Sequence, residues 1–435
     1  MEKYSSYKDS GIYFLPELPS SWKIRKAKYL FNEENRPVSP GDEIVTCFRD
    51  GQVTLRKNRR LDGFTNSMKE IGYQGVRKGD LVIHNMDAFA GAIGVSDSDG
   101  KSTPVYSCCT PKSGDVNQYY YCYLLRYLAR SGFILSLAKG IRERSTDFRF
   151  NDFKELYLPL PSPEEQKAIV AYLDAVTAKI DEAIAQQQRM IDLLNERKQI
   201  IIDQAVSRGV SSVGHAQVLK DSGYDWLGQI PAHWNINKLK YLCKMFGRIG
   251  FRGYSAEDLV EEGEGAVTLS PTNIIEGKLD FTECSYLSWQ KYYESPEIMV
   301  FPGDVIFVKT ASIGKTAYVE SIPLETTINP QILVLKEIIP NSEYLSFYLQ
   351  SSFMQGWVKA TANGSTILTI PQTTIGNYPI ALPSPDEQEA IVDYLKQEIG
   401  KIERAKASVN NTINLLQERK QIIINDIVTG KVKVV

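Results

Sequence analysis

The segment LPSPEEQKAIVAYL at residues 160–173 returns almost unchanged as LPSPDEQEAIVDYL at residues 382–395. In both copies a serine precedes a proline, and a glutamate stands three residues after the serine. A serine N-cap, a proline in the first turn and a glutamate that completes a capping box are preferred residues of a helix start. The two segments therefore predict two helices that begin alike, at Ser162 and at Ser384.

The rest of the chain repeats as well. The stretch KDSGIYFLPELPSSWKIRKAKYL at residues 8–30 corresponds to KDSGYDWLGQIPAHWNINKLKYL at residues 220–242. The segment GDLVIHNMDAFAGAIGV, which starts at Gly79, aligns less closely with GDVIFVKTASIGKTAYV, which starts at Gly303. Each copy thus has an opening motif, a mixed domain and a long helix. A repeat of this length sets the architecture of the chain before any local feature does.

Apolar residues in both long segments follow a spacing of three and four residues, which predicts two amphipathic helices without an interior proline. Roughly 45 residues at 1.5 Å each give a rod of about 65 to 70 Å. The predicted stripes are Ile169, Leu173, Val176, Ile180, Ala183, Met190, Leu194 and Ile201 in the first helix, and Ile391, Leu395, Ile402, Ala405, Val409, Leu416 and Ile423 in the second.

Such a stripe often packs on its own domain. Two matched stripes in one chain can instead pair with each other, and an antiparallel coiled coil would relate the two halves by an approximate twofold axis. The segments LLNERKQIII at residues 193–202 and LLQERKQIII at residues 415–424 agree on their polar faces too. Core packing does not require that agreement, which suggests that two copies of one partner dock on equivalent surfaces.

The repeat divides the chain into two mixed domains at residues 1–160 and 209–382 and two long helices at residues 161–208 and 383–435. Short β-rich runs such as GDLVIHN and INPQILVL alternate with glycine and proline, and shorter helical stretches such as NQYYYCYLLRYLARS follow. We expect an α+β fold for each domain. Because the domains have diverged more than the helices, we interpret them as two different readers on one scaffold.

Charge is distributed unevenly between the two domains, although the formal net charge of the chain is only −2. Residues 1–160 carry 24 basic and 19 acidic side chains, whereas residues 209–382 carry 12 and 17. A basic cluster is most often a solvated surface, but it also suits contacts to phosphates and base edges. The residues that we predict to contact DNA are Arg56, Arg59, Lys139, Arg142 and Arg144 in the first domain, and Lys309, Ser312, Lys315, Asn363, Ser365 and Thr366 in the second.

Several other classes of protein do not fit the sequence. No apolar run approaches the length of a membrane span, and the polar start MEKYSSYKDS is not typical of a signal peptide. The six cysteines form no CxxC pair and the three histidines are scattered, so we expect reduced thiols, no metal site and a cytoplasmic protein. The segment IGKT at Ile313 lacks the glycine that a phosphate-binding loop requires at position 309. We find no other catalytic motif.

The opening motif KDSG…LP…W, the helix starts LPSPEEQKAIVAYLD and LPSPDEQEAIVDYLK and the helix ends LLNERKQIII and LLQERKQIII together resemble the specificity subunits of type I restriction-modification systems. The resemblance covers the whole chain. It implies two target recognition domains, each reading one half of a split DNA sequence, separated by two long helices that form an antiparallel coiled coil. The helices would set the spacing between the half-sites and bind two modification subunits.

The same resemblance implies a chain without catalytic activity. Methyl transfer from S-adenosylmethionine, and ATP- and Mg²⁺-dependent translocation and cleavage, would belong to the modification and restriction subunits. Two other hypotheses remain open on the sequence: a coiled-coil adaptor whose domains bind proteins, and an enzyme with a site too diffuse to recognise. Steep salt dependence of DNA binding would favour the first hypothesis over the adaptor.

Overall fold

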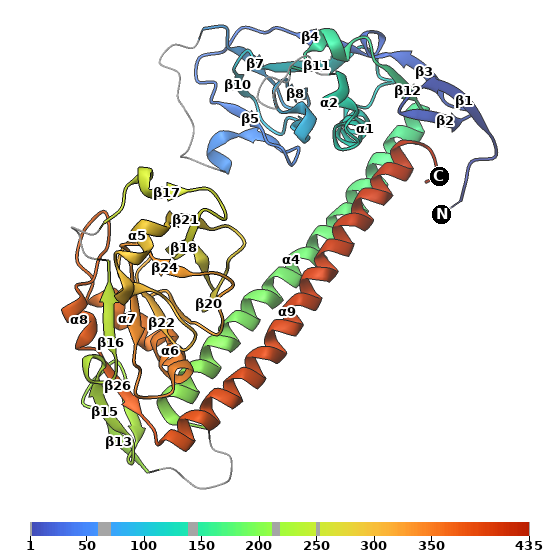
Figure 1. Cartoon of the computed structure of the whole chain (residues 1–435). Coiled ribbons are helices and arrows are strands. Elements are labelled where there is room, and N and C mark those ends of the chain that lie inside the picture. Colours follow the sequence, from blue (N-terminus) through green and yellow to red (C-terminus); the bar gives the residue numbers. More distant parts are fainter. Residues whose placement is uncertain (1, 60–70, 138–146, 211–217, 249–252, 435) are drawn as a thin grey trace. The chain divides into compact units, whose positions relative to one another are not determined.

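The computed structural model describes residues 2–59, 71–137, 147–210, 218–248 and 253–434. The chain forms two compact units, of which unit 1 comprises Met1–Gln187 and Asn411–Val435 and unit 2 comprises Gln188–Asn410 (Figure 1). Two long helices, α4 (Pro163–Arg208) and α9 (Pro385–Val428), each begin in one unit and end in the other. Each unit therefore contains the first part of one helix and the last part of the other.

Unit 1 is built mainly from short antiparallel strands. Its strands are β1 (Tyr7–Ile12), β2 (Leu15–Pro19), β3 (Lys23–Lys26), β4 (Phe31–Glu34), β5 (Val45–Cys47), β6 (Val53–Leu55), β7 (Gln74–Val76), β8 (Leu81–His84), β9 (Ile93–Val95), β10 (Gly100–Ser102), β11 (Tyr106–Pro111) and β12 (Tyr157–Leu160). The opening motif forms the β1-β2 hairpin, β3 pairs with β12, and the central sheet has the order β4-β11-β8-β9. Smaller pairs, β5-β6 and β10-β7, complete the strands.

The helix α1 (Gln118–Arg130) packs on β8 and β9 and is followed by α2 (Phe133–Leu137) and α3 (Phe150–Phe153). Asn117 starts α1 as a side-chain cap, because its Oδ1 accepts the backbone N–H of Tyr119 at 3.0 Å. Tyr120, Tyr121 and Leu124 are fully buried at helical spacing. This face of α1 joins the central sheet to the long helices in one hydrophobic core.

Unit 2 repeats this plan. Its strands are β13 (Leu219–Asp221), β14 (Gln229–Pro231), β15 (Asn235–Lys238), β16 (Lys244–Gly247), β17 (Leu259–Val260), β18 (Gly265–Leu269), β19 (Ile274–Ile275), β20 (Lys278–Leu279), β21 (Ser285–Ser288), β22 (Val305–Val308), β23 (Thr316–Tyr318), β24 (Thr326–Ile328), β25 (Ile332–Lys336) and β26 (Pro379–Leu382). Its short helices are α5 (Trp289–Tyr293), α6 (Ser342–Gln350), α7 (Ser352–Ala360) and α8 (Gln372–Gly376).

The two units correspond strand by strand at their centres. The hairpin β13-β14 matches β1-β2, the pair β15-β26 matches β3-β12, and the sheet β16-β25-β22-β23 matches β4-β11-β8-β9. Unit 2 has a second four-stranded sheet, β17-β21-β18-β24, in which β18 and β24 pair in parallel. The expected α+β fold and internal repeat are therefore confirmed, and the divergence between the domains is concentrated outside the shared sheet.

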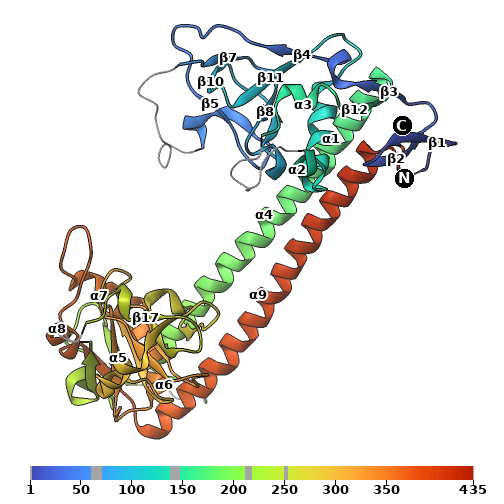
Figure 2. The same cartoon turned by 45° about the horizontal axis from the view of Figure 1, so that its top comes forward.

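The expected antiparallel helix pair is present in each unit (Figures 1 and 2). In unit 1, Ile169 and Leu173 near the start of α4 share a hydrophobic cluster with Ile424 and Ile427 near the end of α9. In unit 2 the roles of the helices are exchanged, since the end of α4 packs against the start of α9 around Ile391, Leu395 and Ile402. The other predicted packing residues, Ile180, Leu194 and Leu416, are buried or half-buried.

The buried stripe differs from the predicted one at some positions. Met190 is 49% exposed, and its neighbour Ile191 is 8% exposed and faces inward instead. In α9 the predicted Ala405 is exposed, and Lys406 takes its place in the buried stripe. The physical reason is that an α-helix has 3.6 residues per turn, so its inward face drifts away from a strict 3-4 pattern over many turns.

The helix starts also differ in part from the predicted capping box. The Oγ of Ser162 accepts the N–H of Glu165 at 3.2 Å, so the serine half is present. The Glu165 carboxylate, however, accepts the hydroxyl of Tyr4 at 2.5 Å. In the second copy, Glu387 likewise accepts Nε1 of Trp234 at 3.0 Å. Glu165 thus holds Tyr4, which precedes the first opening motif, on the start of α4, and Glu387 holds Trp234 of the second opening motif on the start of α9.

Candidate functional site

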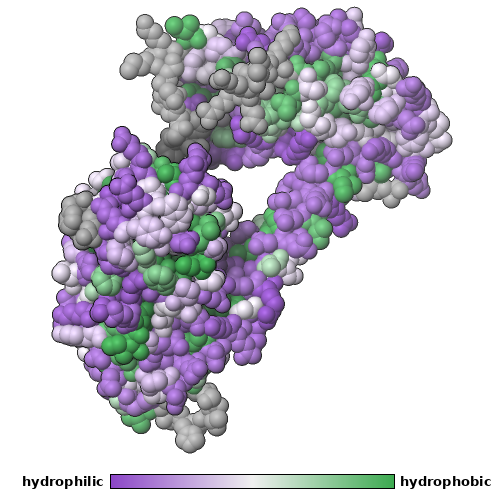
Figure 3. Space-filling view, viewed as in Figure 1, coloured by the Kyte–Doolittle hydropathy of each residue, from purple (hydrophilic) through white to green (hydrophobic). Residues whose placement is uncertain are grey.

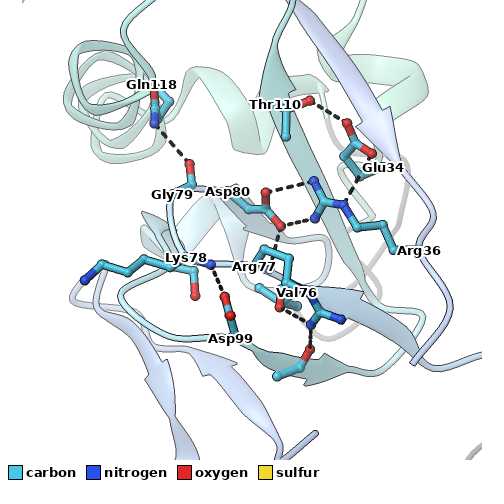
Figure 4. Close-up of polar contacts among 12 residues, drawn as sticks. Glu34, Arg36, Val76, Arg77, Lys78, Gly79, Asp80, Asp99, Thr110 and Gln118 are labelled. Atoms are coloured by element: carbon cyan, nitrogen blue, oxygen red, sulfur yellow. Dashed lines mark hydrogen bonds and ion pairs between the residues drawn. The ribbon is translucent and has the colours of Figure 1, made fainter. Parts of the chain in front are cut away.

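The aspartates of the two GD segments are structural. Asp80 accepts the N–H of Arg77 at 2.8 Å and both terminal nitrogens of Arg36, at 2.5 and 3.1 Å (Figure 4). Its side chain is only 3% exposed, so the arginine neutralises a buried carboxylate. In unit 2, Asp304 accepts the N–H of Phe301 at 2.9 Å and lies 3.1 Å from Nζ of Lys336. The repeated aspartate therefore shapes the turn before β8 and β22.

The strands β8 and β22 end at equivalent positions in the two units. After β8, the carbonyl oxygen of Asn85 accepts the N–H of Phe148 at 3.0 Å. After β22, the carbonyl oxygen of Lys309 accepts the N–H of Ile370 at 2.8 Å. In each domain a segment far along the chain is thus joined to the end of the central strand. The segments just before Phe148 and Ile370 contain most of the residues that we predicted to contact DNA.

In unit 2 this arrangement brings two predicted segments together into one surface, which we call the two-loop surface (residues 309–312 and 363–369). The N–H of Ala311 donates to the carbonyl oxygen of Leu368, and the hydroxyls of Thr310 and Thr369 lie 3.0 Å apart. Asn363 and Thr369 exchange two backbone hydrogen bonds of 2.8 Å. The tip between them is exposed and includes Ser365 and Thr366. Sequence reasoning did not select the two threonines that join the loops.

Lys309 is the cation of this surface. Its side chain is half-buried, and burial lowers the pKa of its ammonium group. Nζ of Lys309 lies beside Gly247, at 3.6 Å from the position that a Cβ of this residue would take. Among the described residues, no carboxylate lies within ion-pair distance of this nitrogen. A partly desolvated ammonium group without an acidic partner is well suited to receive an anion such as a phosphate.

The other two predicted residues of this region differ in their contacts. Ser312 is exposed at the end of the first loop of the two-loop surface. Nζ of Lys315 donates to the carbonyl oxygens of Pro271 and Ile274 at 2.8 and 3.2 Å. That lysine therefore joins two segments of its own domain, and its ammonium group is already hydrogen-bonded.

In unit 1, Arg56 lines a cavity of about 350 Å³ together with Arg49, His84 and Tyr106. Arg59 lies over the ring of Phe48 at 4.2 Å and pairs with Asp50 at 2.7 Å. Burial lowers the pKa of His84, which keeps its ring neutral near pH 7. Lys139, Arg142 and Arg144 lie outside the described residues.

The long helices carry a second candidate surface in equivalent copies. Lys198 on α4 pairs with Glu403 on α9 at 2.9 Å, and Lys420 on α9 pairs with Asp181 on α4 at 2.6 Å. The identical lysines of the two ERKQIII segments thus make the same contact in both units, because position 420 corresponds to 198 and 403 to 181. Helix pairing accounts for that part of the sequence identity.

Four other identical positions of each segment face outward. Leu193 and Leu415 are 59% and 57% exposed, and Ile200 and Ile422 are 53% and 58% exposed. Between them lie the exposed pairs Glu196–Arg197 and Glu418–Arg419, for which the described residues show no ion-pair partner. We call these two sets the helix faces (193, 196, 197 and 200; 415, 418, 419 and 422). The face of the molecule drawn in Figure 3 is mainly hydrophilic, with separate hydrophobic groups.

Parts of both domains and of both long helices match a known protein family. The family model "Type I restriction modification DNA specificity domain" matches residues 75–189 and 272–415, which is more than half of the chain. The chain belongs to this family. In the type I specificity family the two matched regions are DNA specificity domains, so the alternative of a protein-binding coiled-coil adaptor is not favoured.

Relatives of similar length support the assignment to the type I specificity family. A Methanocaldococcus jannaschii protein described as a type I restriction enzyme MjaX specificity subunit is 22% identical over 96% of this chain and 95% of its own length. The Escherichia coli type I restriction enzyme EcoBI specificity subunit is 22% identical over 62% of this chain and 57% of its own length. These proteins are similar to this chain at low identity.

A solved structure agrees with the fold. One chain in the structure described as "Structural basis underlying complex assembly and conformational transition of the type I R-M system" has a TM-score of 0.65 and 19% identity. The match covers 94% of this chain and 98% of that chain.

The described residues include no cluster of histidine, cysteine and acidic side chains that could hold a metal ion. Within that part of the chain, no helix is long and apolar enough to cross a membrane.

Proposed function

We propose that this chain reads a split DNA sequence for a type I restriction-modification complex, with each recognition domain contacting one half of the target. The observation that supports this most directly is the position of the DNA specificity model, which matches once in each half of the repeat. In unit 2 the two-loop surface offers hydroxyl and amide groups next to Lys309. Hydroxyls and amides can read base edges, and a lysine fixes the register on a phosphate.

We assign the helix faces to two modification subunits of the complex. Leu193 and Leu415 occupy the same place in the repeat, and so do Arg197 and Arg419. An exposed leucine and isoleucine around an unpaired arginine is the composition of an interface core rather than of a solvated helix. Two equal faces on one chain suit two copies of one partner.

Catalysis and cofactors are proposed to lie outside this chain. Methyl transfer from S-adenosylmethionine would take place in the modification subunits, and ATP and Mg²⁺ would be used by restriction subunits. This chain would then act by binding double-stranded DNA and by placing the catalytic subunits on it, in the cytoplasm where the DNA lies.

A map of adenine methylation in the host tests the proposal. Deleting the gene should remove methylation from one split motif with a fixed gap and leave all other methylated motifs unchanged. If every methylated motif persists after deletion, the proposed function is wrong. The map also reveals the recognised bases, which then supply the DNA for binding experiments.

The spacing role of the helices is tested by lengthening both of them. Seven residues inserted after Ala185 and seven after Ala407, which is the corresponding position, add one heptad to each helix and preserve its inward face. Each insertion lengthens its helix by roughly 10 Å, about the rise of three base pairs. The methylated motif should then keep both half-sites and widen its gap. An unchanged gap would show that the helices do not set it.

The docking role is tested by reversing charge on one helix face at a time. Arg197→Glu or Arg419→Glu should each reduce the number of bound modification subunits from two to one, as measured by mass in solution. The double variant should bind none. Glu164→Arg, which changes an exposed residue at the start of α4, is the matched control and should retain both subunits.

A further inference from the structure

The turn of the hairpin β19-β20 in unit 2 contains an acidic residue in a strained backbone conformation. Glu276 and Gly277 form its two-residue turn, with φ angles of 48° and 83°. Positive φ at both positions is the geometry of a tight hairpin turn that favours asparagine or aspartate before glycine. A glutamate is disfavoured there, because its Cβ crowds the backbone and its longer side chain makes no local hydrogen bond. Contacts elsewhere must therefore hold Glu276 in this conformation.

Those contacts are made by the long helices. The carboxylate of Glu276 accepts Nζ of Lys406 on α9 with both oxygens, at 2.8 and 3.0 Å. Nζ of Lys198 on α4 lies 3.4 Å from the same carboxylate. Glu403 completes the group, at 2.9 Å from Lys198 and 3.4 Å from Lys406. Two lysines and two glutamates thus alternate, and one glutamate comes from the recognition domain. We call this group the hairpin clasp (Lys198, Glu276, Glu403 and Lys406).

The clasp balances charge that the helices leave uncompensated. Lys406 belongs to the buried stripe between the helices, and its side chain is only 9% exposed. The helices supply two ammonium groups there and one carboxylate, Glu403. A poorly hydrated cation requires an acidic partner, which Glu276 provides. The hydrogen bond from Lys406 lowers the pKa of Glu276, so its carboxylate is charged at neutral pH.

The hairpin tip is also fitted against α6. A Cβ added to Gly277 would lie 2.2 Å from Oε1 of Gln350 at the end of α6. The carbonyl oxygen of Gln350 in turn accepts Nε2 of Gln199 on α4 at 3.2 Å. The end of the Gln350 side chain would have to move to admit a Cβ, and the φ of 83° also favours glycine at this position. The tip therefore occupies a defined place between α6 and the long helices.

Unit 1 has no corresponding clasp among its described residues. Lys420 and Asp181 repeat the pair made by Lys198 and Glu403. The position that corresponds to Lys406 is Ile184, an apolar residue. Pairing of the helices therefore does not require a lysine at this place in the stripe. Lys406 therefore has a role in unit 2 other than helix pairing, and its contact with Glu276 indicates that role.

We propose that Glu276 is a positioning residue, which with Lys406 and Lys198 fixes the orientation of the second recognition domain on the helix pair and so narrows the half-site spacing that the complex accepts. This inference rests on the proposed reading of a split target. The clasp joins the recognition domain to the element proposed to set the spacing. Loosening it leaves the base-reading loops unchanged and lets the domain rotate on the helices.

Two variants test the clasp in the complex with modification subunits. Glu276→Gln removes the charge of the hairpin, and Lys406→Ile installs the residue that stands at the equivalent position of the other half. Methylation is measured on DNA that carries both half-sites at the natural gap, and at gaps one base pair shorter and longer. Both variants should raise methylation at the altered gaps, relative to the natural gap, by about two- to fivefold, as expected for one partly exposed ion pair. Raising the salt concentration should bring the wild-type ratio toward that of the variants.

The matched control is Glu294→Gln, since Glu294 pairs with Lys291 within one short segment, and the described residues show no ion pair between Glu294 and the long helices. It should leave the ratio unchanged. A fall in methylation by the same factor at all gaps in the clasp variants would indicate a loss of stability alone and would overturn the inference. The inference would also be overturned if the ratio of methylation at the altered gaps to methylation at the natural gap were the same in the clasp variants as in the wild type.

Hydrogen exchange on the full chain separates this inference from the proposed function. In Glu276→Gln the backbone amides of Lys278 and Asp280, which lie in the hydrogen-bonded pairs of the hairpin, should exchange several times faster than in the wild type, whether or not DNA is read. If exchange is unchanged, the clasp does not hold the hairpin. If exchange is faster but the wild-type complex methylates no split target, the proposed function is wrong and the spacing role falls with it.

Discussion

The hydroxyl of Tyr120 donates a hydrogen bond of 3.0 Å to the backbone carbonyl oxygen of Val428. The contact joins the first recognition domain to the last residue of α9, which lies 308 residues later in the chain. Tyr344 approaches the carbonyl oxygen of Val206 in the same way at 3.5 Å, and it also donates to Ala381 at 2.7 Å. Each domain thus holds the last turns of the long helix that started in the other half of the repeat.

Replacing Tyr120 by phenylalanine should therefore destabilise unit 1. The buried carbonyl of Val428 loses its side-chain partner without a change in packing, which costs about 1 to 2 kcal/mol of unfolding free energy. Chemical denaturation followed by circular dichroism measures the change. Tyr119→Phe is the control, because Tyr119 is exposed and should give no measurable change. Equal stability of the Tyr120 variant and the wild type would show that the hydrogen bond contributes nothing.

The same tyrosines make stability sensitive to alkaline pH. Burial raises the pKa of Tyr120 and of Tyr344 well above 10.0, the value expected in the unfolded chain. The folded protein therefore binds protons that the unfolded chain releases, so stability is complete below pH 10 and falls as the pH rises beyond it. Thermal melts between pH 8 and 12 should show this fall, together with cooperative tyrosine ionisation by ultraviolet absorbance. Ionisation of all tyrosines near pH 10 without unfolding would contradict the prediction.

Removing the arginine beside Asp80 should be costly. Arg36→Met leaves a carboxylate that is almost completely buried without its cation, which typically costs about 3 to 5 kcal/mol. The double variant Arg36→Met with Asp80→Asn should recover part of that loss, because no unpaired charge remains. Denaturation of the two single variants and of the double variant gives the coupling energy. If the changes in unfolding free energy of the two single variants add up to that of the double variant, the ion pair contributes no coupling energy.

A charge in the helix stripe should separate the two long helices. Leu173 is fully buried, so Leu173→Asp places an unpaired carboxylate between them at a cost of several kcal/mol. Leu395→Asp is the equivalent change in unit 2. Leu193→Asp is the control on the exposed face of α4. If melts of the buried variants match the parent, the coiled-coil contact at these positions is unimportant.

Lys309 should act on DNA binding without changing base preference. If its ammonium group contacts a phosphate, Lys309→Met should weaken binding to cognate and altered sequences alike and reduce the slope of log affinity against log salt by about one. Binding is measured at several salt concentrations with the modification subunits present. Lys291→Met is the control, since Lys291 is already paired with Glu294. A loss confined to one base position would instead identify Lys309 as a base-reading residue.

The sequence alone determined the repeat, the two long helices and the family. A helix start depends on residues within one turn of each other: the cap serines Ser162 and Ser384 accept backbone N–H groups of the first turn, and the proline after each serine fits that turn. A local pattern is therefore sufficient to predict a helix start. The apolar stripes predicted that the helices pair. Short hydrophobic runs bounded by glycine predicted the central strands. The equal charges of the two ERKQIII segments pointed to equivalent surfaces before any contact was known.

The tertiary structure decided which contacts the residues of these patterns make. Glu165 binds Tyr4 and not the helix backbone, because a segment 161 residues away reaches the helix start. Likewise, Lys309 and Asn363 form one surface only because the backbone of Ile370 hydrogen-bonds to the end of β22. Lys406 appears in the sequence as one more helical lysine, and its burial and its acidic partner depend on the turn at Glu276. Contacts between residues far apart in the chain leave no local pattern, so only folding places these side chains together.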